Sequence, residues 1–218
     1  MNLRSEILRG MHSPRKVMLY LLLGHEKFFL LSETVNRDTC YSWKANQNNP
    51  LEIHMTKPTD IHEHLATLFM LTIEFNLKRI LELGTREGES TVALLQAAKQ
   101  INGKVFSIDI DSCLRAKRLI QKYELQKYWE FTQADDLKMK WSTPIDHLFI
   151  DTSHTFDQTL RELEKYEPYV RRGGIITMHD IVSSQGVLSA ITKYLENRDD
   201  LAFYKYFNSN GLGVIFKR

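Results

Sequence analysis

The sequence contains little cysteine, no long apolar run and no large surplus of either charge. The 218 residues include two cysteines, Cys40 and Cys113, which lie far apart and outside any Cys-x-x-Cys spacing. This usage indicates neither a disulfide framework nor a thiolate zinc site. It fits a reducing, cytoplasmic compartment best.

No apolar run is long enough to cross a membrane as a helix. The most apolar segment, residues 17–31, contains His25, Glu26 and Lys27, and its uninterrupted part ends at Gly24. A spanning helix needs roughly 20 apolar residues. The first residues also lack the apolar stretch and small-residue cleavage site of a secretory signal. We therefore expect no transmembrane segment and no membrane partner.

The charges of the chain almost balance, with 29 basic and 27 acidic residues and a net charge of +2. A value so near neutrality gives no reason to expect nucleic acid as a partner, and it favours a small molecule. With 43% hydrophobic and 26% charged residues, the composition is typical of one soluble globular domain. Fibrous, collagen-like and wholly disordered chains are excluded.

The first 57 residues differ slightly from the rest in charge, at +3 against −1. We interpret residues 1–57 as an N-terminal extension and residues 58–218 as the main domain. The extension is expected to be a cap, a lid or a homodimer contact. Residues 17–31 are expected to be buried in this chain or against a second copy of it. Residues 36–57 are either a lid or an ordinary surface loop.

From residue 79 onward, short apolar runs alternate with helical patterns, which is typical of βαβ units around a parallel sheet. Helices are expected over 90–98, 114–123 and 156–166. An Asn/Gly turn over 208–211 joins the last two runs as an antiparallel hairpin. The pattern predicts an α/β fold with a Rossmann-like, doubly wound, seven-stranded sheet that is mostly parallel and ends in this hairpin. The expected strands are 79–83, 105–110, 129–133, 147–151, 175–178, 201–207 and 212–216.

A further helix is expected ahead of the sheet. Asp60 and Glu63 have the spacing of a capping box, in which two side chains satisfy backbone N–H groups at a helix start. His62 and His64 lie two residues apart and would point to different sides of this helix. We therefore expect both histidines at the surface.

A glycine-containing turn follows the first strand. Gly84 and Gly88 lie where a ligand can approach the backbone N–H groups at a helix start. A dinucleotide fingerprint, Gly-x-Gly-x-x-Gly, fails because Arg86 and Glu89 occupy its second and third glycine positions. The turn is therefore either a different ligand site or simple helix packing, and a nicotinamide or flavin oxidoreductase is disfavoured.

An acidic residue, Asp109, ends the second strand about twenty residues after the turn. A carboxylate at this place can accept hydrogen bonds from both hydroxyl groups of a ribose. Asp111 is the reserve candidate for this role, although it is equally suited to cap the next helix.

Two carboxylates and two imidazoles follow the fourth and fifth strands: Asp151, His154, His179 and Asp180. Because adjacent parallel strands lie about 4.8 Å apart, these residues are expected at the same sheet edge as the glycine turn. Asp151 and Asp180 supply oxygen ligands suited to Mg²⁺ or Mn²⁺, and His154 is a candidate general base. In the alternative, Asp151 only orients a cofactor or water, and both histidines cap helices or lie at the surface.

The turn resembles the acidic-x-Gly-x-Gly-x-Gly loop of class I S-adenosylmethionine-dependent methyltransferases, at Glu82, Gly84 and Gly88 but not at Arg86. The Asp-x-x-His and His-Asp pairs are similar to those of metal-dependent O-methyltransferases of sugars and natural products, and of the related cephalosporin-hydroxylase-like branch. This resemblance covers residues 58–218. It implies S-adenosylmethionine as cofactor, with Mg²⁺ or another divalent cation beside it.

The resemblance also implies roles for individual residues. The implied metal ligands are Asp151, Asp180 and His179, and the implied catalytic residues are His154 as base and Asp151. His179 stands where the relatives have an acid, so a softer divalent ion or no metal is also compatible. In catechol-type enzymes the third metal ligand is an amide, and Ile181 stands in its place here. The implied cofactor-binding residues are Glu82, Gly84, Thr85, Gly88, Ser90, Asp109, Ile110, Asp135 and Asp151.

Together these features predict an enzyme that transfers a methyl group from S-adenosylmethionine to a hydroxyl oxygen of a small molecule, such as a sugar or natural product. Arg86 and the irregular metal set leave an alternative. In it, the chain is a methyltransferase-like module without catalysis that binds a cofactor or a partner protein.

Overall fold

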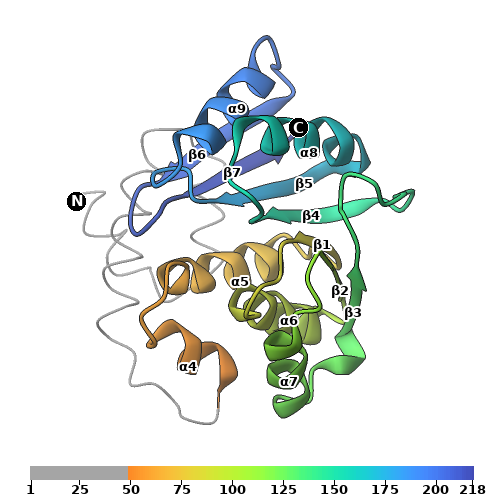
Figure 1. Cartoon of the computed structure of the whole chain (residues 1–218). Coiled ribbons are helices and arrows are strands. Elements are labelled where there is room, and N and C mark those ends of the chain that lie inside the picture. The colour runs from red at the N-terminus through yellow and green to blue at the C-terminus, as the bar shows by residue number, and fades with distance from the viewer. Residues whose placement is uncertain (1–48) are drawn as a thin grey trace, which may run out of the picture.

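The computed structural model describes residues 49–218, whose seven strands form one sheet between two layers of helices (Figure 1). The strand order is β3-β2-β1-β4-β5-β7-β6. β7 pairs antiparallel with β5 and β6, and the other pairs are parallel. The predicted Rossmann-like sheet with a terminal hairpin is confirmed. The strands are β1 (Arg79–Leu83), β2 (Lys104–Asp109), β3 (Trp129–Gln133), β4 (Ile145–Ile150), β5 (Val170–His179), β6 (Leu201–Tyr206) and β7 (Leu212–Lys217).

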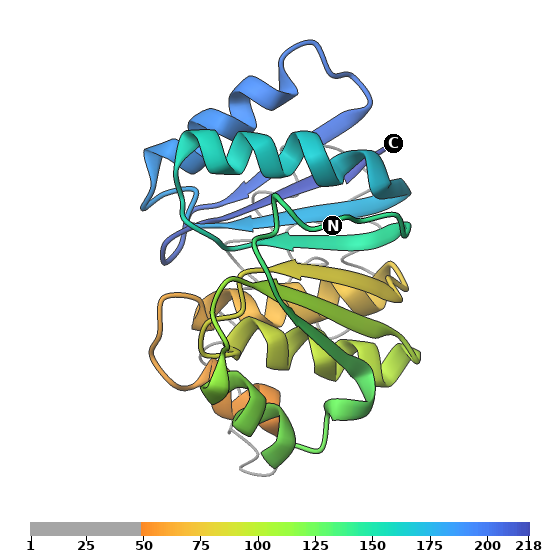
Figure 2. The same ribbon diagram turned by 45° about the vertical axis from the view of Figure 1, so that its right-hand side comes forward.

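Helices cover both faces of the sheet (Figure 2). One face carries α4 (Pro50–Met55), α5 (Leu65–Glu74), α6 (Glu89–Ile101) and α7 (Leu114–Lys122), and the other carries α8 (Phe156–Tyr166) and α9 (Gln185–Leu195). In β1, Ile80 belongs to the first of the two apolar cores, whereas Leu81 and Leu83 belong to the second. Burial on both faces explains why this strand is so continuously apolar in sequence.

The predicted strand ends lie within two residues of the observed ones, except in β5, which begins at Val170 rather than at residue 175. Gly173 and Gly174 interrupt the apolar pattern of this strand and conceal its first half. Helix α9 is absent from the predictions, although Val187, Ala190 and Ile191 are buried at helical spacing.

The segment before β1 begins differently from the expected helix. A short 3₁₀ turn, η1 (His62–His64), precedes α5, and no side chain caps it, so the predicted capping box is wrong. Asp60 pairs instead with Arg86, and Glu63 accepts a hydrogen bond from Asn208 Nδ2 at 2.8 Å. The expected surface position of His64 is also wrong, because the 3₁₀ turn directs this side chain inward, where it is fully buried.

Residues 49–57 pack on the sheet domain although they fall in the predicted extension. Leu51 is buried in the same apolar core as α5 and α6, and His54 Nε2 lies 3.2 Å from the Tyr123 hydroxyl. The boundary after residue 57 stays a prediction. Predictions for residues 1–48, including the apolar segment 17–31, Cys40 and the homodimer contact, lie outside the described residues.

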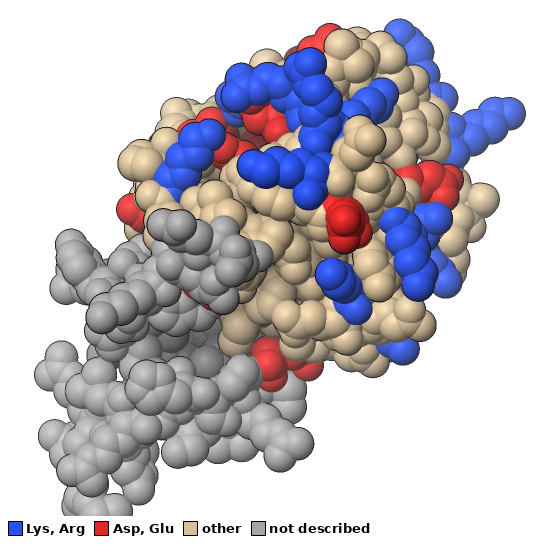
Figure 3. All heavy atoms as spheres, turned by 90° about the horizontal axis from the view of Figure 1, so that it is seen from below, with Lys and Arg blue, Asp and Glu red and all other residues tan. Residues whose placement is uncertain are grey.

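No helix within residues 49–218 is both long and apolar enough to cross a bilayer. Seen from the side of α4 and α7, Lys and Arg side chains form several groups with Asp and Glu side chains between them (Figure 3). This mixed pattern agrees with the small net charge of the chain.

Candidate active site

The turn after β1 brings the ends of two neighbouring strands into direct contact. Gly84 and Gly88 have left-handed backbone angles, with φ of +86° and +89°. A Cβ on Gly84 would lie 2.0 Å from the carbonyl oxygen of Asp151, and one on Gly88 would lie 2.8 Å from the Cβ of Ala116. Glycine is therefore required at both positions, and the turn is packed against the residue that follows β4.

Glu82 lies in a closed cluster of hydroxyl groups below this turn. Its side chain is fully buried, and its carboxylate accepts hydrogen bonds from Ser90 (2.8 Å), Thr91 (2.8 Å) and Ser107 (2.6 Å). Burial raises the pKa of Glu82 to about 7. Ser90 and Thr91 open α6, so the cluster fixes the helix start beside the turn. The expected contacts of Glu82 and Ser90 with a cofactor stay predictions.

Asp109, at the end of β2, holds the turn through its carboxylate. One oxygen accepts hydrogen bonds from the backbone N–H groups of Thr85 at 2.7 Å and Arg86 at 3.0 Å, and the other accepts one from Asp111 at 2.8 Å. Burial opposes ionisation, but these bonds outweigh it and lower the pKa of Asp109. An ionised carboxylate is thus fixed at the sheet edge, beside the glycine turn.

Arg86 occupies the middle glycine position of the resembled loop with a left-handed φ of +43°. Its guanidinium lies 3.0 Å from the carboxylate of Asp60. The side chain is therefore directed to the segment before α5, and the turn keeps its shape without a third glycine.

Two apolar side chains near Asp109 are open to solvent: Ile110 is 70% exposed and Leu114 is 61% exposed. Asp135, after β3, pairs with Lys138 at 2.8 Å and also accepts a backbone N–H. Ile110 therefore offers a free apolar surface within the predicted cofactor site, whereas the carboxylate of Asp135 already has two partners.

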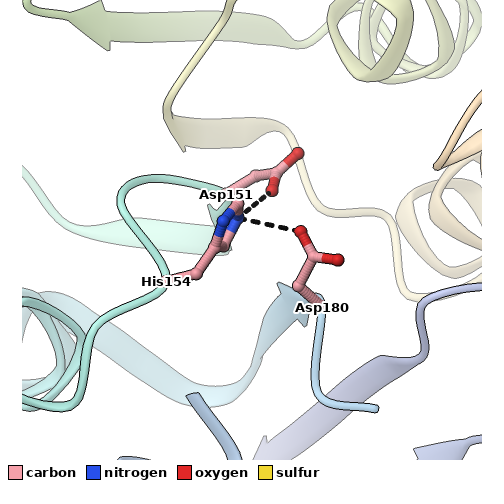
Figure 4. Close-up of side chains that lie close together, drawn as sticks. All are labelled: Asp151, His154 and Asp180. Carbon is pink, nitrogen blue, oxygen red and sulfur yellow. Dashed lines mark hydrogen bonds and ion pairs between the residues drawn. The ribbon is translucent and has the colours of Figure 1, made fainter. Parts of the chain in front are cut away.

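Asp151, His154 and Asp180 converge beyond the ends of β4 and β5 (Figure 4). His154 Nε2 lies 2.9 Å from Asp151 Oδ1 and 2.9 Å from Asp180 Oδ2, so one imidazole bridges both carboxylates. His179 Nδ1 approaches the same two oxygens, at 3.4 Å and 3.3 Å. The four residues lie together at the sheet edge, as the sequence predicts.

The two carboxylates hold both imidazoles in their charged form. Hydrogen bonds to Asp151 and Asp180 raise the pKa of His154 to about 10. Burial lowers the pKa of His179, but the same carboxylates outweigh it and raise the pKa to about 9. Although burial opposes their ionisation, the imidazoles lower the pKa of both Asp151 and Asp180. In this cluster, two charged imidazoles thus compensate the negative charge of two carboxylates.

Backbone strain marks the same place. His154 and Asp180 have left-handed φ angles of +57° and +62°, a conformation that costs about 1–3 kcal/mol for a residue other than glycine. Ser184 Oγ donates to the carbonyl of His154 at 2.7 Å, and Ser183 Oγ donates to the Asp180 carboxylate. These two serines were not expected at the site, although their place directly before a helix is a usual signal for a local hydrogen bond.

His64 is a second residue that the sequence did not place here. Its ring lies edge-on to that of His179, with 5.7 Å between the ring centroids, and its Nε2 lies 3.1 Å from the carbonyl oxygen of Asn208. Because η1 and the β6–β7 turn are far from β5 in sequence, only the tertiary structure reveals this neighbour.

The donor atoms of the cluster fit a divalent cation. One atom each from Asp151, His154 and Asp180 lies within 4.8 Å of the others, and both ring nitrogens of buried His179 lack a hydrogen-bond partner within the described residues. Carboxylates suit Mg²⁺, Ca²⁺ and Mn²⁺, whereas imidazoles suit Zn²⁺, Fe²⁺ and similar ions. The mixed set therefore fits Mn²⁺ or Zn²⁺ better than Mg²⁺.

Comparisons with known proteins agree with this fold. Residues 81–181 match the model of a methyltransferase domain family. A methyltransferase of Podospora anserina, solved with S-adenosylhomocysteine, is 14% identical and has a TM-score of 0.66, over 85% of this chain and 96% of that one. An O-methyltransferase of Bacillus cereus, also solved with S-adenosylhomocysteine, is 17% identical with a TM-score of 0.60, over 90% and 93% of the two chains.

A third similar structure is the O-methyltransferase TomG of Streptomyces achromogenes, involved in tomaymycin synthesis and solved with S-adenosylmethionine. It is 16% identical, with a TM-score of 0.60 over 85% of this chain and 96% of that one. At such identities the likeness concerns the fold, whereas the family match covers the segment from the glycine turn through Asp180. The fold is therefore the Rossmann-like fold of class I S-adenosylmethionine-dependent methyltransferases, and the segment 81–181 matches a methyltransferase domain.

Proposed function

We propose that the chain transfers the methyl group of S-adenosylmethionine to a hydroxyl oxygen of a small molecule, with a divalent cation at the acid–imidazole cluster. One observation carries the proposal. The carbonyl of Asp151 packs against Gly84 of the cofactor turn, while its carboxylate holds His154. A methyl donor bound on the turn therefore lies next to a group that can take a proton.

The cofactor is expected along the ends of β1, β2 and β3. Gly84, Thr85 and Gly88 shape a turn that lets the ligand approach the backbone. The ionised carboxylate of Asp109 is the acceptor for the ribose hydroxyls, and exposed Ile110 provides an apolar surface for the adenine ring. Asp135 is assigned to the adenine amine and Asp151 to the end of the cofactor that carries the amino acid, whereas Glu82 and Ser90, which are hydrogen-bonded to each other, hold the turn in shape.

Asp151, Asp180 and His179 would hold the cation. A bound divalent ion supplies Lewis acidity that lowers the pKa of a substrate hydroxyl. The carboxylates of this chain keep that region negative, and Phe156 and Val182, which follow His154 and Asp180 by two residues in sequence, are exposed apolar side chains. The chain's own residues thus bind the acceptor hydroxyl beside the methyl donor, in line for attack.

His154 is assigned the role of general base. While it alone bridges both carboxylates, its pKa of about 10 keeps it protonated at neutral pH. It can accept a proton once another cation shares the carboxylates, because the attraction that raises its pKa is then reduced. During transfer, the new C–O bond forms as the S–CH₃ bond breaks, and the hydroxyl proton passes to His154 Nε2.

The direct test has two parts. Titration calorimetry with S-adenosylmethionine should give saturable binding at micromolar concentration, and incubation with labelled cofactor and a panel of hydroxylated small molecules should label an acceptor. Absence of binding at high micromolar cofactor would overturn the proposal. Binding without transfer over a broad panel would instead support the non-catalytic alternative, and activity unaffected by a chelator would remove the metal from the mechanism.

A further inference from the structure

Three buried ring nitrogens beside the acid–imidazole cluster lack a hydrogen-bond partner among residues 49–218: Nδ1 of His64 and both nitrogens of His179. The two side chains are 0% and 1% exposed. A buried polar atom without a partner destabilises a fold by about 1–3 kcal/mol. Nδ1 of His179 has only two long ion pairs, of 3.4 Å and 3.3 Å, to Asp151 and Asp180. The other two nitrogens have no partner among these residues, so the two touching rings need a common explanation.

The tautomer of His64 follows from its surroundings. Its Nε2 lies 3.1 Å from the carbonyl oxygen of Asn208, and a carbonyl can only accept, so Nε2 must carry the proton. An imidazolium buried without a carboxylate partner is costly, and neither nitrogen of His64 has such a partner among the described residues. The ring is therefore neutral, and its Nδ1 presents a bare lone pair.

His179 has the complementary need. Its Nδ1 lies toward Asp151 Oδ1 and Asp180 Oδ2, at 3.4 Å and 3.3 Å. Because the two nitrogens of an imidazole point in nearly opposite directions, Nε2 faces away from these carboxylates. The ring of His64 lies edge-on to the ring of His179, with 5.7 Å between the ring centroids and 70° between the ring planes. Imidazoles joined by an N–H···N bond of about 3 Å have ring centres roughly 5 Å apart, so the observed separation of 5.7 Å is close to the one that such a bond requires.

We propose that His64 is a positioning residue that accepts the Nε2–H of His179 and thereby leaves the Nδ1 lone pair of His179 free for a divalent ion shared with Asp151 and Asp180. Metal-binding histidines generally donate their other N–H to a neighbouring acceptor, which fixes tautomer and orientation. The inference rests on the proposed metal-assisted function and adds a contact from η1, a segment far from the cluster in sequence. It gives all three nitrogens a partner at once.

Zinc calorimetry on the full chain tests this role. His64→Phe keeps an aromatic ring but removes the acceptor, and it should weaken Zn²⁺ binding by about 10–100-fold. His64→Asn restores an oxygen near the place of Nδ1 and should recover most of that loss. His147→Gln is the matched control, because His147 is also fully buried but has Thr72 and Thr177 hydroxyls on its two nitrogens. It should leave the Zn²⁺ affinity unchanged.

Nitrogen-15 NMR of the wild-type protein with Zn²⁺ gives a readout that needs no variant. We expect His64 and His179 both in the Nε2–H form, with zinc on Nδ1 of His179. Wild-type Zn²⁺ affinity in His64→Phe, the Nδ1–H form of His64, or a wild-type chain that binds no Zn²⁺ would each overturn the inference. Cofactor calorimetry reports separately on the methyltransferase function, so a failure of one can be distinguished from a failure of the other.

Discussion

Two buried carboxylate clusters lie along this sheet edge, and they differ in how their polar atoms are satisfied. Around Glu82, three hydroxyl groups donate to two oxygens. Around Asp151 and Asp180, two imidazoles crowd the same oxygens, and buried His179 keeps both ring nitrogens without a hydrogen bond among the described residues. The backbone of the second cluster is strained as well, at His154 and Asp180.

This difference indicates which cluster supports the structure and which one carries out the chemistry. A fully hydrogen-bonded cluster stabilises one geometry and has no capacity left for a ligand. A cluster with unsatisfied donors and strained backbone is less stable than it could be, and such places are typical of functional sites. We therefore assign Glu82 to holding the cofactor turn in shape, and Asp151, His154 and Asp180 to binding and proton transfer.

Replacing His154 should produce the largest effect. If His154 Nε2 takes the hydroxyl proton, His154→Gln lowers kcat by about 10²–10⁴-fold, while the Kd for S-adenosylmethionine stays within a factor of about two. Steady-state kinetics and calorimetry measure the two quantities. Ser153→Ala, in the exposed neighbouring position, is the control and should retain activity. An unchanged kcat in His154→Gln would show that the general base does not belong to this cluster.

Replacing Gly84 should break the link between the turn and the cluster. In Gly84→Ala, the new Cβ meets the carbonyl of Asp151 at 2.0 Å in a left-handed backbone, so the free energy of unfolding should fall by about 3 kcal/mol or more. In Gly173→Ala, φ is also left-handed, at +74°, but the nearest atom is the flexible end of Arg171 at 3.2 Å.

Denaturant unfolding of both glycine variants isolates the clash from the left-handed strain. We expect Gly173→Ala to lose only about 1–2 kcal/mol. Equal losses in the two variants would mean that Asp151 does not need to approach the turn closely.

Removing one hydroxyl group from the cluster around Glu82 should lower the stability of the fold without affecting ligand binding. Ser107→Ala removes the 2.6 Å hydrogen bond to Glu82 and the acceptor of Trp129 Nε1. Buried partners left unpaired in this way destabilise by about 1–3 kcal/mol, which thermal and denaturant unfolding would show. Cofactor affinity should change by less than about threefold. A large loss of affinity would place Glu82 in the ligand site itself.

Part of the pH dependence of stability should come from the strained cluster, in addition to buried Glu82, whose pKa is raised to about 7. Without a divalent ion, the pKa values of His154 and His179 are raised to about 10 and 9, against about 6.5 in an unfolded chain. A raised pKa means that the folded state holds the proton more tightly. The stabilisation is therefore complete below about pH 6.5 and is lost as the pH rises toward 10.

Measuring the free energy of unfolding in chelator between about pH 6 and 9.5 tests this trend. His154→Gln should flatten the decline, because it removes the histidine whose pKa is raised most. The same slope in wild type and variant would contradict the assignment.

The sheet could be predicted from sequence because short apolar runs alternate with helical patterns, and because burial on both faces makes a strand such as β1 a continuous apolar run. Asp151, His154, His179 and Asp180 could be placed together because parallel strands end at one edge. His64 could not, since its position depends on a 3₁₀ turn held by Asn208, 144 residues away. The partners of Asp60 and Glu63 were hidden for the same reason: a capping motif predicts local bonds, and tertiary partners replaced them.

The smallest expected effect concerns Arg86, where the turn departs from three glycines. Arg86→Gly relieves a left-handed φ of +43°, worth about 1–2 kcal/mol. It also loses an exposed ion pair to Asp60, worth about 0–1 kcal/mol, and it gains chain entropy in the unfolded state. These contributions oppose one another, so the net change should stay within about 1 kcal/mol, and cofactor affinity within about threefold.

Asp60→Asn is the control for this exchange, since it weakens the same ion pair without altering the backbone of the turn. If Arg86→Gly tightens cofactor binding more than tenfold while Asp60→Asn does not, the arginine itself hinders the ligand. The turn would then resemble the strained cluster around Asp151, and not the fully hydrogen-bonded cluster around Glu82. If both variants bind the cofactor as wild type does, two glycines and the carboxylate of Asp109 are sufficient to shape the site.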